Sequence, residues 1–259
     1  MYPVLFHLGP IPIHTYGFLI AMGFLTGIAV CRRLLRGTGI PEDRDVDLAF
    51  WVLLVGFIGT RVLFVITQLD YYLAHPLDIF KVWQGGLVFY GGPLTATPFA
   101  VWYIRKYRLP FWKTMDAFVP GVVIAQAFGR MGCLAAGCCY GKETHTDYGI
   151  QLFSGLVDEK MRGINLHPTQ IYSSFSLFVF FLFMVWTYRR KKFDGQVVLT
   201  YFMGYPIIRS IIEIYRGDLV RGFVIDNVLS TSQFISIIVF LIATVVLVLR
   251  LKKIQNKND

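Results

Sequence analysis

Charged residues are scarce in this sequence. Asp, Glu, Lys and Arg make up only 16% of its 259 residues, whereas 55% are hydrophobic, a composition that excludes an ordinary soluble globular domain. Cysteine is also rare, because four cysteines, three of them in one segment, are too few for a disulfide scaffold. The segment 1–18 has neither a basic region nor a small-residue cleavage site, so we expect no removable signal peptide.

Repeats and linkers are lacking too. The two halves of the chain show no convincing internal repeat, which argues against a transporter built from inverted repeats. No low-complexity linker divides the sequence. We therefore predict a single transmembrane domain over residues 1–259.

The sequence contains long apolar runs instead. A membrane-spanning helix needs about 20 mainly apolar residues, and seven segments meet this condition. The sequence therefore predicts an all-α polytopic membrane protein with seven transmembrane helices. They are expected at 17–35, 46–68, 87–104, 115–137, 169–188, 197–215 and 232–250.

The basic residues indicate how these helices are oriented. Most of the 25 lysines and arginines lie after the first, third and fifth spans and in the C-terminal tail. The positive-inside rule then puts the N-terminus outside and the C-terminus in the cytoplasm. The polar insertion at about 142–167 is expected to form a small extracytoplasmic cap, in which 147–153 (DYGIQLF) fits a short strand. Because topology explains the net charge of +9, we expect no nucleic-acid partner.

Three arginines lie inside predicted spans, namely Arg61, Arg130 and Arg209. An ionised side chain in a membrane helix costs at least about 2.5–3.5 kcal/mol, so each is a candidate functional residue. Each sits about two turns before the outer end of its span, roughly 10 Å below the outer surface. Snorkelling or pairing could also explain each one, and Arg209 has Glu213 one turn on, with Arg216 a further turn along.

The surplus of positive charge at this level is best matched by a phosphate, which arginine binds with two parallel hydrogen bonds. The depth favours the headgroup of a phospholipid in the outer leaflet. Other polar or glycine-rich features cluster at the same end, and glycines beside Tyr90 would let the backbone approach a ligand. His167 also fits a helix-entry residue with Thr169 as cap. The candidate binding residues at this end are His14, Tyr16, Gly91, Gly92, His167, Gln170 and Arg216.

The segment GRMGCLAAGCCYGK (129–142) holds three of the cysteines. Its C-x4-C-C spacing does not fit the common paired zinc-ligand spacings, and His145 is the nearby further candidate ligand. The small residues around the cysteines favour close helix packing with the thiols as apolar fillers. A disulfide from Cys138 or Cys139 and a metal site are the alternatives. We expect neither a metal nor a cofactor.

Six stretches taken together resemble the bacterial prolipoprotein diacylglyceryl transferase family. They occur in the family's order along nearly the whole chain. The stretches are IHTYGFLIAMGF (13–24), GTRVLF (59–64), VWQGGLVFYGG (82–92), DAFVPGVVIAQAFGRMG (116–132), HPTQIY (167–172) and GYPIIRSIIEIYRGD (204–218).

The resemblance implies an enzyme of the bacterial cytoplasmic (inner) membrane with its active site facing the outer leaflet. Such enzymes transfer the diacylglyceryl group of phosphatidylglycerol to the lipobox cysteine thiol of a lipoprotein precursor and release glycerol phosphate. The family's headgroup-binding arginine falls on Arg130, and the arginine and glutamate of its sixth span fall on Arg209 and Glu213. Its tyrosine and glycine of the first span fall on Tyr16 and Gly17.

The sequence also departs from the family pattern. The usual two asparagines and glutamate after the arginine are Cys133, Ala136 and Cys138 here. The usual histidine in the glycine-flanked motif, a proposed general base, is Tyr90, and Ser173 takes an acidic place after HPTQ.

Chemistry assigns Arg130 and Arg209 to the departing phosphate, with Glu213 orienting Arg209, while Arg61 and Arg216 would hold lipid or gate its access. The acceptor thiol has an ordinary pKa of about 8.5 and must lose its proton. A tyrosine phenol, with an ordinary pKa of about 10, could act as base only beside cations. Tyr90 is therefore a candidate base that His14 or His167 could replace. We favour activation of the thiol by the arginines themselves.

Two rival functions remain at the level of the sequence. One is a transporter of lipid or an anionic solute, because buried arginines also line transport pathways. The other is a divergent relative that uses another thiol acceptor or another headgroup, which the altered positions 90, 133, 136 and 138 would suit.

Overall fold

The computed structural model describes residues 4–8, 11–82, 85–217, 223–225 and 229–258. Within these ranges the chain is mostly helical, and six helices have the length and composition to cross a membrane. This confirms the prediction of a helical membrane protein. The six are α1 (Thr15–Leu35), α2 (Glu42–Thr67), α5 (Phe111–Ala136), α6 (Thr169–Arg190), α7 (Gln196–Ile214) and α8 (Thr231–Asn258).

A seventh span at 87–104 is not confirmed. The helix found there, α4 (Gly91–Lys106), has 16 residues, which gives it a length of about 24 Å against the roughly 30 Å of a bilayer core. Residues 85–90 directly before it are not helical. Gly85 and Gly86 take φ values of +87° and +76°, so the apolar run that follows them does not start a helix until Gly91.

Backbone contacts divide the chain into two compact units, residues 1–31 with 115–259, and residues 32–114. The second unit contains α2, α4, a short helix α3 (Leu69–Ala74) and a 3-10 helix at Pro76–Phe80. Helices α2 and α4 lie side by side. A Cβ atom on Gly59 or Gly91 would overlap the backbone or Thr95 of the facing helix, so glycine is needed for this contact. The Thr95 hydroxyl donates to the carbonyls of Val55 and Gly91.

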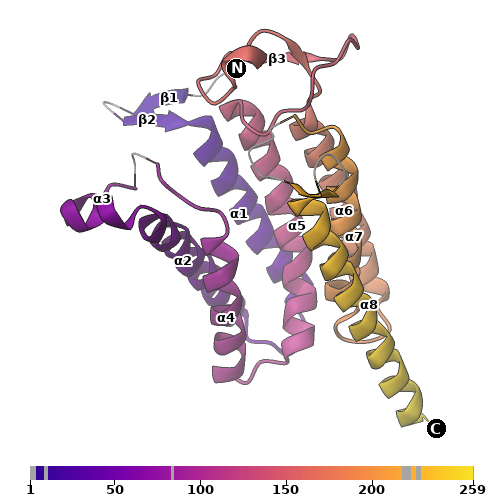
Figure 1. Cartoon of the computed structure of the whole chain (residues 1–259). Helices are drawn as coiled ribbons and strands as arrows, with labels where there is room; N and C mark the ends of the chain where they lie inside the picture. Colours follow the sequence, from indigo (N-terminus) through magenta and orange to yellow (C-terminus); the bar gives the residue numbers. More distant parts are fainter. Residues whose placement is uncertain (1–3, 9–10, 83–84, 218–222, 226–228, 259) are drawn as a thin grey trace. The chain divides into compact units, whose positions relative to one another are not determined.

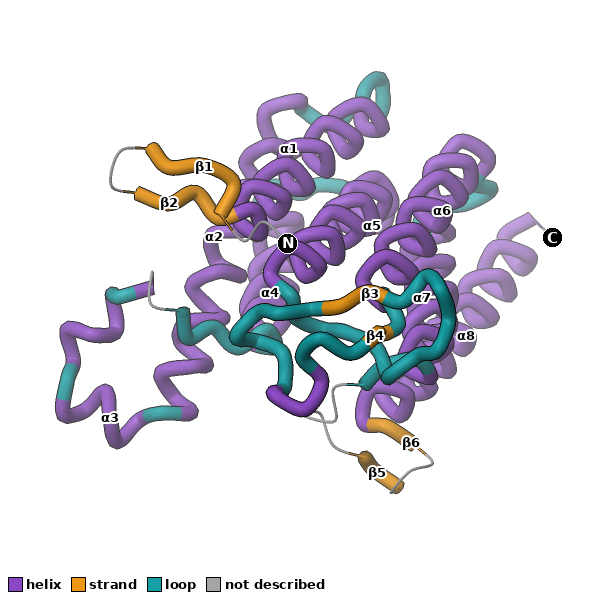
Figure 2. The backbone as a smooth tube through the Cα atoms, turned by 90° about the horizontal axis from the view of Figure 1, so that it is seen from above, coloured by secondary structure: helices purple, strands orange, loops and turns teal. Residues whose placement is uncertain are grey.

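The first unit contains α1, α5, α6, α7 and α8. Glycines bring α1 close to α5, because a Cβ on Gly27 would lie 2.8 Å from the Gly121 carbonyl oxygen and one on Gly121 would lie 2.6 Å from that of Gly27. Helix α7 packs between α6 and α8 in the views of Figures 1 and 2. Such small-residue contacts are typical of membrane helices, where dispersion replaces the hydrophobic effect as the attraction.

The described residues also form three two-stranded antiparallel sheets, which the prediction of an all-α fold did not include. Strands β1 (Val4–Leu8) and β2 (Ile11–His14) precede α1, and β5 (Phe223–Ile225) and β6 (Leu229–Ser230) precede α8. In the insertion, β3 (Ile150–Gln151) pairs antiparallel with β4 (Asn165–Leu166), which confirms the strand expected in 147–153. Figure 2 looks down on this insertion.

The insertion has a core of its own. Tyr140, Leu152, Val157 and Leu166 are buried together, and the Tyr140 hydroxyl accepts from the backbone N–H of Asp158. This core lets the insertion keep a defined shape at the end of the first unit where α5 ends and α6 begins.

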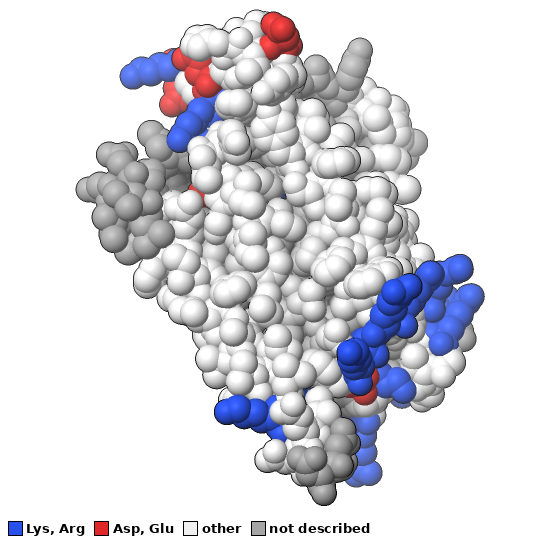
Figure 3. Space-filling view, turned by 90° about the vertical axis from the view of Figure 1, so that its right-hand side faces the viewer, with Lys and Arg blue, Asp and Glu red and all other residues white. Residues whose placement is uncertain are grey.

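Charge is distributed unevenly over the face that Figure 3 shows. In this view lysines and arginines gather at one end. A broad belt that is almost free of charge follows, and acidic residues appear at the other end together with a few basic ones. This pattern is typical of a helical membrane protein.

Candidate functional site

Three chain segments meet at one end of the first unit. The loop after α5 pairs with the residues before α6, because Gly141 N–H donates to the His167 carbonyl over 3.0 Å and His167 N–H to the Lys142 carbonyl over 2.9 Å. Lys142 N–H also donates to the carbonyl of Tyr215 at the end of α7, over 2.9 Å. A Cβ on Gly141 would lie 2.5 Å from the Cβ of His167. The loop is therefore clamped between α6 and α7.

The HPTQ segment holds the same loop with side chains. The Thr169 hydroxyl donates to the Cys139 carbonyl, and the Gln170 amide nitrogen donates to the Cys138 carbonyl, both over 2.8 Å. Thr169 does not cap α6, because Pro168 occupies the N-cap position and no side chain bonds there. The alternative of a Thr169 cap is therefore wrong, and Gln170 contacts the loop that carries two of the cysteines.

The end of α5 explains why two cysteines meet. Gly137 has φ +77° and donates to Leu134 O, while Cys138 N–H donates to Cys133 O over 3.1 Å. These bonds form a Schellman motif, in which the residue after the left-handed glycine contacts the third-last helical residue. Here both partners are cysteines, so the helix end itself brings the Cys133 and Cys138 side chains together.

Cys139 completes a cluster of three thiols. Its φ of +62° is rare for a residue other than glycine and costs about 1–2 kcal/mol. The sulfur atoms of Cys133, Cys138 and Cys139 all lie within 4.8 Å of one another, and His145 is not part of this group. All three are free thiols. The residue pattern favoured packing, with a disulfide or a metal site as alternatives, and did not predict that all three thiols meet. A glycine just before the second cysteine of C-x4-C is the signal of the Schellman motif.

The thiols beyond the helix have shifted acidities. Hydrogen bonds with the thiols of Cys133 and Cys138 hold the pKa of Cys139 below its ordinary range. The positive charges of Arg216 and Arg130 lower the pKa of the same thiol further. Hydrogen bonds to the other two thiols, together with burial, raise the pKa of Cys138. Cys139 is therefore the more readily ionised of these two thiols.

Arg130 lies in α5 one turn before Cys133 and is half-buried. Within the part of the chain that the structure describes, its side chain forms no hydrogen bond or ion pair. Its electrostatic neighbours include Tyr16, Cys133 and Cys139. The Tyr16 ring packs against Gly132, since a Cβ on that glycine would be 3.0 Å from the ring. A guanidinium so placed is available for an anionic ligand.

Arg209 has its charge balanced. Its Nη1 lies 2.5 Å from the Glu213 carboxylate, and the two side chains are only 9% and 11% exposed. This is the ion pair one turn apart that the sequence predicted. Arg216, one turn further, is buried and pairs by its backbone with Gly141.

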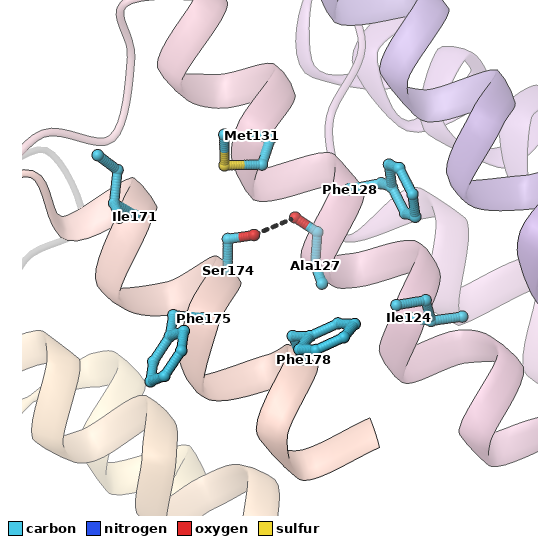
Figure 4. A pocket seen from close by; sticks show the side chains of 8 residues that line it. All are labelled: Ile124, Ala127, Phe128, Met131, Ile171, Ser174, Phe175 and Phe178. Atoms are coloured by element: carbon cyan, nitrogen blue, oxygen red, sulfur yellow. Dashed lines mark hydrogen bonds between the residues drawn. The ribbon is translucent and has the colours of Figure 1, made fainter. Parts of the chain in front are cut away.

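An apolar groove with a volume of about 320 Å³ lies between α5 and α6. Its hydroxyl group, on Ser174, donates to the Ala127 carbonyl over 3.0 Å and so presents little polarity to the groove. Figure 4 shows the lining side chains. They are Ile124, Ala127, Phe128 and Met131 from α5, and Ile171, Ser174, Phe175 and Phe178 from α6.

The second unit contains Arg61, whose guanidinium is held by four hydrogen bonds. Its Nε donates to Ile79 O, its Nη1 to Gly85 O and Gly86 O, and its Nη2 to Asp78 O, over 2.8–3.0 Å. Four of its five N–H donors therefore bind backbone carbonyls in the segment before α4. This geometry favours a positioning role for Arg61 over direct binding of lipid.

Tyr90 and its glycines lie in the same unit. The Tyr90 side chain is 57% exposed and packs edge-on against Phe89. Gly91 and Gly92 approach α2 at Gly59 and Thr60. The close approach that these two glycines allow is thus explained by helix packing.

Comparison with known proteins decides the family. A family model described as prolipoprotein diacylglyceryl transferase matches residues 3–249. The chain belongs to the prolipoprotein diacylglyceryl transferase family. It is 36% identical to the phosphatidylglycerol–prolipoprotein diacylglyceryl transferase of Clostridium tetani, over 93% of this chain and 95% of that protein. The protein of the same name from Finegoldia magna is 33% identical over 99% of this chain and 98% of its own length.

As a member of the diacylglyceryl transferase family the chain is an enzyme, as the sequence predicted. Most of the site residues predicted for such a transferase lie in the first unit, at the end where α5 and α7 finish and α1 and α6 begin. His14 lies in the β1–β2 hairpin just before α1, paired with Val4. That arginines of both units share one level stays a prediction. The residues at this end of the first unit are His14, Tyr16, Arg130, His167, Gln170, Arg209, Glu213 and Arg216.

Proposed function

We propose that this transferase moves the diacylglyceryl group of phosphatidylglycerol to the lipobox cysteine thiol of lipoprotein precursors and releases glycerol phosphate. The names of its relatives support the two substrates. The observation that carries the proposal is Arg130, a half-buried guanidinium in a membrane helix without a protein partner among the described residues. A cation in that position requires an anion, and a phospholipid supplies one at the level of its headgroup.

The proposed reaction breaks the bond between a glyceryl carbon and a phosphate oxygen. The departing phosphodiester becomes a monoester and gains negative charge as the bond breaks. A preorganised cation that binds the leaving oxygens stabilises this change, and one such contact is typically worth about 2.7–4 kcal/mol. We assign this contact to Arg130. Arg209, oriented by Glu213, supplies a second guanidinium to the phosphate, and Arg216 helps to hold the lipid.

The groove between α5 and α6 is proposed to take an acyl chain of the lipid. Its α5 lining comes from residues 124–131, the stretch of helix that includes Arg130, and the groove is apolar apart from the internally bonded Ser174. Its volume lies at the lower end of the range for small-molecule sites. A lipid whose headgroup binds Arg130 would thus find an apolar path for one chain next to its phosphate.

We propose a topology with the N-terminus outside and the C-terminus in the cytoplasm, in the bacterial cytoplasmic membrane, with both units forming one transmembrane domain. The insertion then lies outside, and the site faces the outer leaflet. Basic residues lie at or just beyond the C-terminal ends of α1, α4, α6 and α8, and placing all four ends on the cytoplasmic side requires α4 to cross as well. A helix of 16 residues can do so if the apolar residues before it span the remaining depth.

The proposed function is tested by incubating the purified protein with phosphatidylglycerol and a lipobox peptide and measuring the peptide mass. We expect the mass to increase by one diacylglyceryl group on the cysteine. A peptide with serine in place of that cysteine is the matched control and is expected to stay unmodified. Absence of the mass shift with phosphatidylglycerol, or a shift of equal size with a zwitterionic phospholipid alone, would contradict the proposal. Substrate movement across sealed vesicles without any peptide modification would support a transporter instead.

Replacing Tyr90 by phenylalanine is expected to leave most of the transfer rate intact from pH 6 to 9. The Tyr90 ring is exposed, and the arginines can favour the thiolate form of the acceptor cysteine without a tyrosine base. The measurement is the initial rate of peptide modification at each pH, with Phe89→Leu as control for the neighbouring ring. A loss of about 100-fold or more in Tyr90→Phe, with a changed pH profile, would make Tyr90 the base.

A further inference from the structure

The three-thiol cluster has the dimensions of a metal site. A zinc-class ion binds thiolate sulfur at about 2.3 Å, so sulfurs that share such an ion lie about 3.8–4.0 Å apart. The sulfurs of Cys133, Cys138 and Cys139 lie within 4.8 Å of one another without an ion. Side-chain rotations that move each sulfur by less than about 1 Å would bring the three sulfurs to the spacing that one ion requires.

The backbone that carries the thiols is fixed. The Schellman motif holds Cys133 and Cys138, and the carbonyls of Cys138 and Cys139 are bound by Gln170 and Thr169. A site whose ligands are already held in place spends little free energy on ordering them when an ion binds. The unusual φ of Cys139 is the kind of local strain that clusters at functional sites.

Simple packing does not account for these cysteines as it does for Cys31. Cys31 is a buried single thiol that is 3% exposed in α1, whereas the three clustered thiols are only partly buried. Partial exposure gives an ion access to the sulfurs. It also makes Cys31 the natural internal control for any thiol reagent.

We propose that Cys133, Cys138 and Cys139 bind a thiophilic divalent ion of the zinc class, and that the fourth position of this ion takes the acceptor thiol. Three protein ligands with one open position are typical of catalytic zinc sites. The second part of this proposal rests on the proposed function, because it needs a thiol acceptor. The first part stands on the geometry of this chain alone and departs from our prediction that no metal is bound.

Charge supports the site. Three thiolates and one divalent ion carry a net charge of −1, and Arg130 and Arg216 both act electrostatically on the Cys139 thiol. The positive charges of these arginines would offset the negative charge of the complex. Tyr16 is the titratable neighbour from α1.

The proposed step balances. The acceptor thiol releases its proton to water as its sulfur binds the ion, and the resulting thiolate attacks the glyceryl carbon. A carbon–sulfur bond forms, the carbon–oxygen bond to phosphate breaks, and its electron pair leaves with glycerol phosphate at Arg130. The thioether product is a weaker ligand and dissociates, and the ion keeps its oxidation state. At pH 7 only about 3% of a free thiol with a pKa near 8.5 is ionised, so full ionisation gains up to about 30-fold in rate.

The site is tested first by titrating the purified full-length protein with Cd²⁺ and recording thiolate-to-metal charge-transfer absorption in the ultraviolet. We expect the band to saturate at about one equivalent in the unaltered protein and in Cys31→Ser. Cys133→Ser, Cys138→Ser and Cys139→Ser should each lose it, while their helical circular dichroism shows that they remain folded. Absence of the band in the unaltered protein, or an equal band in the three variants, would overturn the site.

The fourth position is tested with Co²⁺, whose absorption reports the number of sulfur ligands. A lipobox peptide should raise the charge-transfer band by about a third, from three to four thiolates, and its serine counterpart should not. An equal response to both peptides would overturn the role of the ion.

Activity then separates the two proposals. Removal of metal by a chelator should slow peptide modification at pH 7 by up to about 30-fold, and Zn²⁺ should restore the rate. Full activity without metal would overturn the role of the ion but not the transfer reaction. No transfer in either state, with the Co²⁺ response intact, would overturn the proposed function and leave the metal site standing.

Discussion

Replacing Arg130 by alanine is expected to abolish diacylglyceryl transfer while the chain stays folded. Its guanidinium has no protein partner among the described residues, so its loss breaks no internal ion pair. In the transition state the same loss leaves the growing charge on the phosphate without its nearest cation. One such contact is worth about 2.7–4 kcal/mol, or about 10²–10³-fold in rate, before any loss of lipid binding. The measurement is the rate of peptide modification with phosphatidylglycerol.

Two control variants make this result specific. Arg130→Lys keeps the charge but loses the planar fork, so we expect it to recover part of the rate. Arg189→Ala removes an exposed arginine from the last turn of α6, at the opposite end of the helices, and should leave the rate unchanged. Near-normal transfer by purified Arg130→Ala would remove Arg130 from the mechanism.

Hydropathy predicted most of the fold because long apolar runs leave few alternatives. All six long helices fall on predicted spans. The helix predicted at 87–104 begins too early, because residues 87–90 are apolar but not helical. Two glycines with positive φ precede them, and the carbonyls of these glycines are bound by Arg61. Such a long-range contact leaves no periodic signal in the local sequence.

The site was predictable where the chemistry is local. Glu213 follows Arg209 by one helical turn, and the structure shows the ion pair. Arg61 shows the limit of the same reasoning. The free-energy cost of burying its charge is offset by hydrogen bonds to backbone carbonyls 17–25 residues away in the sequence. A buried arginine in a sequence does not reveal whether a ligand or a distant loop satisfies it.

The cysteine cluster lay between these cases. The C-x4-C-C spacing argued against a metal because the usual spacings of paired zinc ligands describe cysteines held by one kind of tight turn. The helix end after Ala136 makes C-x4-C a contacting pair through the left-handed glycine between them. The Schellman motif that Gly137 indicates is enough to predict a contact between Cys133 and Cys138. The φ of Cys139 and its carbonyl contact with Thr169 depend on the packed loop and could not be read from the sequence.

Replacing Asp116 by alanine is expected to destabilise the chain by about 3–5 kcal/mol, which is the cost of breaking a buried ion pair on one side. Asp116 is fully buried near the start of α5 and accepts hydrogen bonds from Lys191 Nζ at 2.9 Å, Gly195 N–H at 2.8 Å and Val198 N–H at 3.1 Å. Without it, the lysine loses its buried partner and two amides at the start of α7 lose their acceptor.

Asp194 offers a matched control for that prediction. It also pairs with Lys191, at 2.8 Å, but its side chain is 51% exposed, so Asp194→Ala should cost at most about 1 kcal/mol. The measurement is the unfolding midpoint of each purified variant in the same detergent. Because Asp116 lies about 21 Å along α5 from Arg130, the folded fraction of Asp116→Ala should still transfer at a near-normal rate per folded molecule. Equal destabilisation by both substitutions would mean that the exposed partner, rather than the buried one, fixes Lys191 and the start of α7.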